Sequence, residues 1–570
     1  MTRTAEDRVT FKNVDGAEQV LTPEFVSFVA TAYDKFSARV LDIRAKREAM
    51  LERAVRCGVM PDFLPPSEAT TGDWKVPPVP EDLLQPGIEI SGPVSIASMA
   101  INAVNPGPEG ERAAGYLDDD EDSGGHCLSD TVKAAINRLG ITKGTLTFHN
   151  AARNRTYSII GGATPFFMHR ERGLHLDEAD FQVDGKPISA TILGMALTFA
   201  HVGKAQVERG QGLYFYLPKT EVVEEAEFYR DFFEFCKTYL QYPEDAVIRG
   251  IFLVESLPVI YIMEEMLYAL GPYAAGLNAA RWDLKASILE YIMADPDQVW
   301  PDRFGVDIKT TPFMSNIFRR LVAVCLKRGA VPIGGMATAL PSRDDEVNKA
   351  AAASIQGDKE WEAQQGFLRA WVAHIFHMKT AGDPFKKLRA TDWKPTDAMF
   401  VPENFPVVIE TPEGPTTLAG THRNARMIIE YLEGWIGGRG AKGIDSLEGK
   451  PGIHPALMED LATGRISVAQ MAQRIIHGVV AEDTEQKHDL ALAKQVLQEE
   501  LDDILKFRKA AVPAGDAAAE TTFKAQEEGY RKAFKASLRW IKNYVDLDFR
   551  SLGTYTPADF DRIAAEPDAF

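Results

Sequence analysis

Short apolar runs alternate with helical segments from about residue 87 to residue 375, and this alternation restricts the chain to very few folds. The stretches between the runs are long enough for a helix, so consecutive strands are expected to be parallel. The runs are Ile88–Ile90, Phe166–Met168, Tyr214–Leu217, Ile251–Val254, Val331–Ile333 and Trp371–Ala373. Their number and spacing predict an α/β fold, a closed (β/α)8 or TIM barrel rather than an open sheet.

The regions on either side of the barrel are predicted to be helical. Apolar residues recur at helical spacing over 21–56, and a Pro-rich extended connector follows over 61–93. After about residue 376, helices are predicted over 422–437, 468–480, 485–509 and 517–545, the second of them capped by Ser467. The expected domains are a helical clasp with its connector at 1–86, the barrel at 87–378 with an insertion near 103–165, and an all-helical plug at 379–570.

Composition and charge exclude several classes of function. The 570 residues are 45% hydrophobic and carry a formal net charge of −19, which argues against nucleic acid or an anionic membrane as the main partner. The four cysteines form no CxxC pair, so neither a disulfide framework nor a structural zinc site is expected. With no apolar signal core and no apolar stretch long enough for a bilayer, we expect a cytoplasmic protein.

Two acidic residues, Glu255 and Asp283, end neighbouring apolar runs with a helix-like segment between them. A strand–helix–strand unit brings the carboxyl ends of parallel strands to one rim, where barrel enzymes gather their active sites. Carboxylate oxygens suit Mg²⁺. The pair therefore predicts a magnesium site, and the alternative is that each acid ends its strand in an ion pair.

Three further features are candidates for chemistry. Arg172, just after the run 166–168, could donate to an enolate or carboxylate, or form a surface salt bridge with Glu171 or Asp177. Asp460, in a loop before the Ser467-capped helix, could be a general base, or a solvated loop acid. The acidic run 118–122 is interpreted as a solvated loop. Gly334-Gly335 would allow close backbone approach to a ligand.

Many blocks of this sequence, taken in order, resemble the malate synthase family, most closely its shorter A-type form. The blocks cover nearly the whole chain and include Pro61-Asp62-Phe63-Leu64-Pro65, Arg170-Glu171-Arg172-Gly173-Leu174-His175-Leu176, Gly276-Leu277-Asn278-Ala279-Ala280-Arg281-Trp282-Asp283, Pro312-Phe313-Met314, Gly334-Gly335-Met336-Ala337 and Met458-Glu459-Asp460-Leu461-Ala462-Thr463. The resemblance implies a barrel with an N-terminal clasp and a C-terminal helical plug.

The resemblance also implies roles for individual residues. Glu255 and Asp283 match the Mg²⁺ ligands, Arg172 the arginine that stabilises the enolate, and Asp460 the general base. The implied substrates are acetyl-CoA and glyoxylate, condensed to malyl-CoA and hydrolysed to malate and CoA, as in the glyoxylate cycle. The substrate-binding residues are expected to be Ala280, Arg281, Trp282, Gly335 and Pro312. No nucleic acid or membrane partner is implied, and the oligomeric state stays open.

Some positions depart from the family pattern. Ala280 replaces the usual glycine, Leu174 replaces a tryptophan, and the stretch 365–375 lacks the family's acids, a glycine and the final proline. These departures lie away from the four positions with catalytic roles. They keep two alternatives open: an enzyme that uses another acyl-CoA or 2-oxoacid, and a catalytically silent homologue that binds a metabolite.

Overall fold

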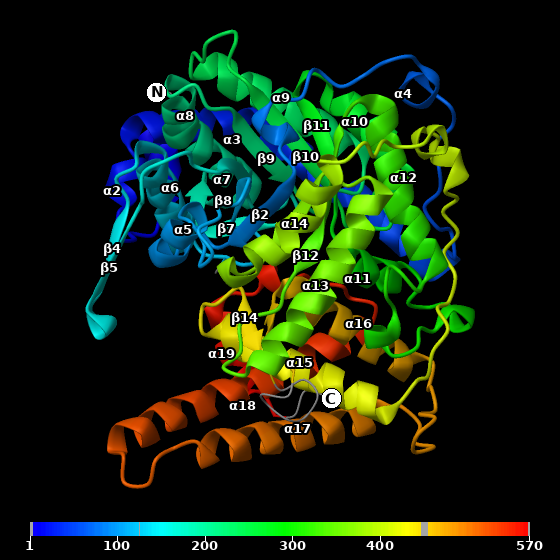
Figure 1. Cartoon of the computed structure of the whole chain (residues 1–570). Coiled ribbons are helices and arrows are strands. Elements are labelled where there is room, and N and C mark those ends of the chain that lie inside the picture. The colour runs from blue at the N-terminus through cyan, green and yellow to red at the C-terminus, as the bar shows by residue number, and fades with distance from the viewer. Residues whose placement is uncertain (1–3, 125, 446–453, 568–570) are drawn as a thin grey trace. The chain divides into compact units, whose positions relative to one another are not determined.

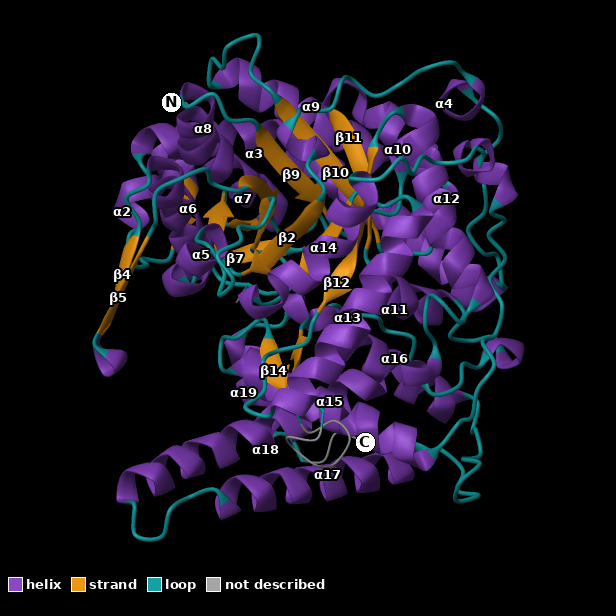
Figure 2. Ribbon diagram, in the orientation of Figure 1, coloured by secondary structure: helices purple, strands orange, loops and turns teal. Residues whose placement is uncertain are grey.

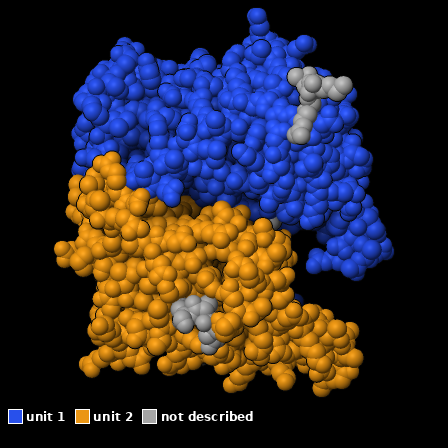
Figure 3. All heavy atoms as spheres, turned by 180° about the vertical axis from the view of Figure 1, so that it is seen from behind, with its two compact units in different colours: residues 1–50, 61–281, 316–407 blue, residues 51–60, 282–315, 408–570 orange. Residues whose placement is uncertain are grey.

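The computed structural model describes residues 4–124, 126–445 and 454–567, which form two compact units. Unit 1 comprises residues 1–50, 61–281 and 316–407, and unit 2 comprises residues 51–60, 282–315 and 408–570 (Figure 3). The expected limits of the three domains stay a prediction.

Unit 1 contains a closed barrel of eight parallel strands, which confirms the predicted fold class (Figures 1 and 2). Around the ring the order is β10-β11-β12-β13-β2-β3-β6-β9. The strands are β2 (Gly87–Gly92), β3 (Gly115–Asp119), β6 (Phe166–Arg170), β9 (Leu213–Leu217), β10 (Ile248–Val254), β11 (Ala274–Ala279), β12 (Val331–Ala337) and β13 (Arg369–Val372).

Helices follow the barrel strands in the βα rhythm that the sequence predicts. They are α5 (Ala97–Val104), α6 (Leu128–Lys143), α7 (Ala190–Leu197), α8 (Lys204–Glu208), α9 (Val223–Tyr239), α10 (Met263–Leu270), α11 (Arg281–Tyr291), α12 (Pro312–Arg328), α13 (Asp345–Gln365) and α14 (Met378–Arg389). A π-helical segment, Thr198–Gly203, joins α7 to α8.

The barrel interior is filled by apolar side chains from alternate positions of the strands, as closed barrels require. The core cluster contains Leu117, Met168, Tyr216, Ile251, Leu253, Ile333 and Trp371, among others. Ala280 and Met336 pack against this cluster and are only partly buried. The interior is therefore a packed core, and ligands have access only to its rims.

The segment 103–165 is not wholly an insertion, because it supplies the barrel strand β3. Only the antiparallel hairpin of β4 (Thr147–Asn150) and β5 (Arg155–Ser158) is a sheet of its own. The sequence conceals β3 because this strand ends in two aspartates and so lacks an apolar run. A barrel strand whose last residues are acids is polar at its carboxyl end, so the apolar pattern that predicts strands does not extend over it.

The N-terminal part of unit 1 includes the predicted long helix, here α3 (Pro23–Cys57), whose last residues belong to unit 2. Short helices α1 (Ala5–Arg8) and α2 (Ala17–Val20) precede it, and α4 (Glu68–Thr71) follows. A small sheet joins β1 (Val9–Phe11), β7 (Asp177–Val183) and β8 (Lys186–Ser189). Arg47 of α3 pairs with the buried Glu225 of α9 at 2.9 Å, which ties the helix to the barrel's outer layer.

Unit 2 is mainly helical, as predicted for the C-terminal region. Its helices are α15 (Leu418–Ile436), α16 (Leu461–Ile476), α17 (Leu490–Ala510), α18 (Ala517–Val545) and α19 (Pro557–Ala565), and a two-stranded sheet joins β14 (Lys442–Ile444) to β15 (Leu457–Glu459). Helix α15 packs against α16, α17 and α18.

Among residues 4–124, 126–445 and 454–567, no helix combines the length and the apolarity that a membrane crossing needs. The four cysteines are free thiols in the structure, with Cys236 and Cys325 buried and Cys57 exposed.

Candidate active site

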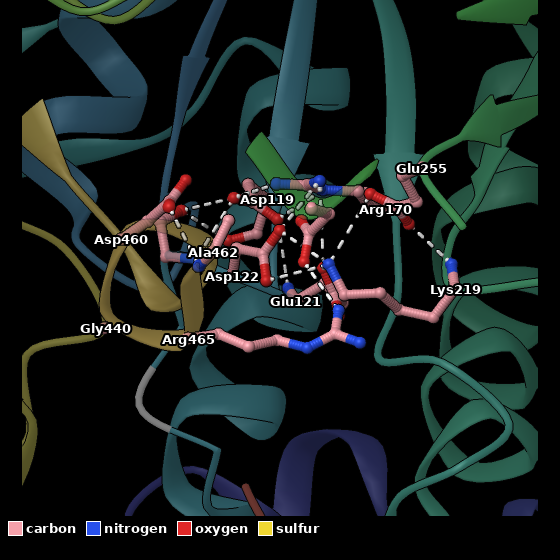
Figure 4. Close-up of polar contacts among 12 residues, drawn as sticks. Asp119, Glu121, Asp122, Arg170, Lys219, Glu255, Gly440, Asp460, Ala462 and Arg465 are labelled. Atoms are coloured by element: carbon pink, nitrogen blue, oxygen red, sulfur yellow. Dashed lines mark hydrogen bonds and ion pairs between the residues drawn. The ribbon is translucent and has the colours of Figure 1, made fainter. Parts of the chain in front are cut away.

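An acidic site lies where β3, β6, β9 and β10 end at the carboxyl rim of the barrel in unit 1. Glu255 directly follows β10, and its Oε1 accepts the backbone N–H of Lys219 at 2.5 Å. The Lys219 ammonium lies 3.1 Å from Asp122 Oδ2 and 3.5 Å from Glu255 Oε2. Figure 4 shows these side chains converging. Lys219 has a φ of +53°, a left-handed conformation that is costly for a residue with a side chain.

Arg170, the last residue of β6, also binds the acidic run. Its Nε and Nη2 donate to the two oxygens of Asp119 at 2.7 and 2.6 Å, and its Nη1 donates to Asp122 at 3.2 Å (Figure 4). Such a fork of charged hydrogen bonds fixes both partners. Burial would raise the pKa of Asp122, but Lys219 and Arg170 outweigh it and hold that pKa below its ordinary value.

The interpretation of 118–122 as a solvated loop is wrong, because all five acids are buried. Asp118 binds Arg138 at 2.6 Å and His169 at 2.5 Å, and Arg138 also binds Glu171 at 2.5 Å. The basic partners come from distant parts of the sequence, so no local pattern reveals them. Compensation by these cations is what allows so many carboxylates to stay buried.

The donor set in this part of unit 1 fits a hard divalent cation. Asp122 and Glu255 each present a carboxylate oxygen, and these oxygens lie within 4.8 Å of each other. Arg170 and Lys219 form ion pairs with the carboxylates of this site, which are Asp119, Glu121, Asp122 and Glu255. Both buried oxygens of Glu121 lack a hydrogen-bond partner among the described residues. Carboxylate oxygens gathered at one place match Mg²⁺, which prefers oxygen ligands.

Arg172 is buried two residues beyond β6, so the surface salt bridge considered for it is wrong. Its Nη2 donates to Glu178 at 2.6 Å and to Thr131 Oγ1 at 3.1 Å. Burial would lower the pKa of Arg172, but the Glu178 carboxylate raises it above the ordinary value. Its partner Glu178, which lies on the small sheet in β7, is not predicted by the sequence.

Asp283 lies in unit 2, in the first turn of α11, rather than at the end of an apolar strand. Its Oδ1 accepts a bond from Arg465 Nη1 at 3.2 Å, and Arg465 Nε also binds Glu290 at 2.7 Å. The Tyr544 hydroxyl donates to Glu290 at 2.7 Å. Asp283 is therefore a buried acid in a helix, and Arg465 is a cationic partner of its carboxylate.

Asp460 is the N-cap of α16, so the expected Ser467 cap is wrong. Asp460 Oδ1 accepts the Ala462 N–H at 3.1 Å, and its backbone N–H donates to Thr463 Oγ1 at 3.2 Å in a capping box. Ser467 lies inside the helix and donates to the Thr463 carbonyl at 2.8 Å. The cap fixes the Asp460 backbone and one carboxylate oxygen at the end of a helix.

The five expected substrate-binding residues divide between the two units. Ala280 and Arg281 follow β11 in unit 1, and Arg281 Nη2 donates to the Met336 carbonyl at 3.0 Å. Gly335 lies within β12 rather than after it. In unit 2, the Lys285 ammonium lies 4.5 Å from the centre of the Trp282 ring, and Pro312 begins α12. Their contacts with substrate stay a prediction.

Comparison with known proteins gives the class. Residues 166–397 match the family described as malate synthase, TIM barrel domain, and residues 415–545 match malate synthase, C-terminal. Malate synthase of Myxococcus xanthus is 34% identical over 486 residues, 85% of this chain and 86% of that protein. Malate synthase A of Escherichia coli is 31% identical over 83% of this chain and 86% of that protein.

A plant relative agrees: glyoxysomal malate synthase of Ricinus communis is 33% identical over 81% of this chain and 80% of that protein. The chain belongs to the malate synthase family. It is an enzyme of the acyltransferase class, and this argues against the alternative hypothesis of a catalytically silent homologue.

Proposed function

We propose that this enzyme condenses acetyl-CoA with glyoxylate and hydrolyses the product to malate and CoA, with Mg²⁺ as cofactor, as the glyoxylate cycle requires. The observation that carries the proposal is the buried acidic site at the barrel rim, where Asp122 and Glu255 meet Lys219 and Arg170. Membership of the malate synthase family supports the same substrates.

Glu255 and Asp283 are the proposed Mg²⁺ ligands, and Asp122 is a further carboxylate on the same rim. Bound Mg²⁺ would neutralise the glyoxylate carboxylate and polarise its aldehyde. Lys219 and Arg170 hold the pKa of Asp122 below its ordinary value, and hydrogen bonds from Arg170 and from the Lys219 backbone keep Asp122 and Glu255 in place. The Lys219 N–H fixes one oxygen of Glu255 directly.

The carbon–carbon bond is proposed to form through two residues of the chain. Asp460 accepts a proton from the acetyl methyl group, and the electron pair moves onto the thioester oxygen, where the Arg172 guanidinium stabilises it. The methyl carbon then attacks the aldehyde carbon of glyoxylate, and the aldehyde oxygen takes up a proton. Water finally cleaves the thioester, and CoA leaves as the thiol.

Both residues are prepared for these roles within their own units. Glu178 and Thr131 hold Nη2 of Arg172, so the guanidinium does not have to be ordered during the reaction. The capping box holds Asp460 on the rigid end of α16. A fixed base and a fixed cation are both needed because the acetyl α-proton is weakly acidic.

A second acceptor remains a candidate because of Ala280, which carries a methyl group where the family usually has glycine. Ala280 is partly buried against the barrel core. The added methyl group would change the room available to a 2-oxoacid.

Release of free CoA thiol tests the proposal. Purified enzyme with Mg²⁺, acetyl-CoA and glyoxylate is expected to release thiol, and EDTA or omission of either substrate should stop it. Asp460→Asn with an unchanged melting curve is expected to lose activity. Folded parent enzyme that releases no thiol with glyoxylate, or that turns over another 2-oxoacid faster, would refute the proposed substrate.

A further inference from the structure

Strand β12 contains a bulge at Gly334 and Gly335. Ile333 pairs with Arg369 and Met336 pairs with Trp371, so two residues of β12 stand opposite the single residue between those partners in β13. A bulge takes backbone groups out of the ladder and re-aims the following side chain, and bulges are frequent beside active sites. The freed groups need other partners, because they are buried.

Helix α13 supplies partners for both polar groups of Gly335. Glu362 Oε1 accepts the Gly335 N–H at 3.2 Å, and Lys359 Nζ donates to the Gly335 carbonyl at 2.5 Å. Lys359 and Glu362 are themselves 3.0 Å apart and buried. Apolar side chains would cover the strand as well as this ion pair does, since a buried pair adds little net stability. The Lys359–Glu362 pair instead fixes the position of the Gly335 backbone, whose N–H and carbonyl it binds.

Two more side chains hold the groups next to this peptide. Asn278 Nδ2 donates to the Gly334 carbonyl at 3.0 Å, and Arg281 Nη2 donates to the Met336 carbonyl at 3.0 Å. A Cβ at Gly334 would lie 2.3 Å from Glu362 Oε2, so a larger residue there would displace the Glu362 carboxylate from its present position. The bulge is thus held by four polar side chains from β11, α11 and α13.

The residue that this bulge positions is Met336. It pairs in register with Trp371, so the two side chains lie on the same face of neighbouring parallel strands. Trp371 belongs to the core inside the barrel, and Met336 and Ala280 pack against that core. The Arg170 guanidinium lies 5.5 Å from the centre of the Trp371 ring, and Arg170 binds Asp122 of the acidic site. Met336 therefore stands at the rim, next to the tryptophan that borders this site.

We propose that the Met336 side chain is a wall of the oxoacid pocket and selects the acceptor by size. Lys359 and Glu362 are positioning residues that hold this wall through the Gly335 peptide. The inference rests on the proposed function, because it assigns the acceptor end of that same site. A hydrophobic wall discriminates by roughly 10–200-fold for each methylene group that it must accommodate.

Met336→Ala tests the wall, with glyoxylate and pyruvate compared as acceptors in the thiol-release assay. The ratio of kcat/KM for pyruvate to that for glyoxylate is expected to rise by about tenfold or more. The KM for acetyl-CoA should stay within about twofold. An unchanged acceptor ratio in folded, active Met336→Ala would overturn the proposal.

The double variant Lys359→Met/Glu362→Leu tests the positioning. It replaces the ion pair by apolar residues, an exchange that is often neutral for folding. The KM for glyoxylate is expected to rise by about tenfold, with the KM for acetyl-CoA unchanged and pyruvate less strongly rejected. Glu362→Gln keeps an oxygen for the Gly335 N–H and should restore most of the selectivity. Glu360→Leu, at an exposed site on the same helix, is the matched control.

The outcomes separate the two levels of the proposal. A parent enzyme that uses neither oxoacid refutes the proposed function, and the inference with it. An active parent with a double variant that loses only melting temperature, or that raises the KM of both substrates equally, refutes the positioning role alone.

Discussion

Replacing Glu89 by leucine is expected to destabilise the barrel locally by about 3–5 kcal/mol, because it strands a buried cation. Glu89 Oε1 accepts a bond from Arg369 Nε at 2.5 Å, and Oε2 accepts one from the Tyr216 hydroxyl at 2.8 Å. Glu89 and Arg369 have no solvent exposure. Leucine removes both bonds, and Arg369 then keeps the hydrogen bond to the Leu83 carbonyl and its position over the Phe166 ring.

The double variant Glu89→Leu/Arg369→Met removes both charges and is expected to cost only about 0–2 kcal/mol. The coupling energy between the two sites should then be at least about 2 kcal/mol. Hydrogen exchange of peptides from β2 and β13 measures the local opening free energy, which suits a chain of two units better than a global melt.

The exposed pair of Glu346 and Lys349 provides the control, since Glu346→Leu should change the same exchange by less than about 1 kcal/mol. Additive effects of the two buried substitutions, within about 0.5 kcal/mol, would refute the reasoning. They would mean that Arg369 does not depend on Glu89 for its charge compensation.

Three further predictions concern the site and unit 2. Asp460→Asn should lower kcat by about 10²–10⁴-fold while the KM for glyoxylate changes little, and an equal loss in KM would contradict a role as base. Mg²⁺ should raise the melting temperature of the parent but not of Glu255→Gln, as measured by differential scanning fluorimetry; an equal rise in both would remove Glu255 from the ligands. The hydrogen bond to Glu500 raises the pKa of His422 above its ordinary value of 6.5. The contribution of this hydrogen bond to the free energy of unfolding is therefore complete below pH 6.5 and is lost as pH rises through the folded-state pKa of His422. Urea unfolding midpoints of Glu500→Gln should lack this decline with pH.

The barrel was predictable because seven of its eight strands carry apolar runs, and such runs separated by helices have few solutions. β3 escaped because it ends in Asp118 and Asp119, whose burial depends on Arg138 and Arg170. Those cations are far away in the sequence, so no local pattern connects them to the acids. A single sequence does not show which distant basic residues compensate the charge of these buried acids.

The candidate site was predictable only in part, for a related reason. Glu255 follows an apolar run and is found at the rim, as expected. The ion pair of Arg172 with Glu178 and the contact of Asp283 with Arg465 depend on tertiary packing. The cap of α16 was misplaced by seven residues because Leu461, Ala462 and Gly464 show no clear amphipathic repeat.

The pairing of β13 with β2 completes the barrel, and it joins residues that stand far apart in the chain, such as Arg369 and Gly87. During synthesis β2 leaves the ribosome early, and the strand that covers its free edge follows 280 residues later, counted from Glu89 to Arg369. Until then the nascent chain exposes two unpaired parallel edges, which are templates for association with other chains. A fragment that ends before β13, at Arg369–Val372, would retain those open edges and is expected to aggregate more readily than the whole chain.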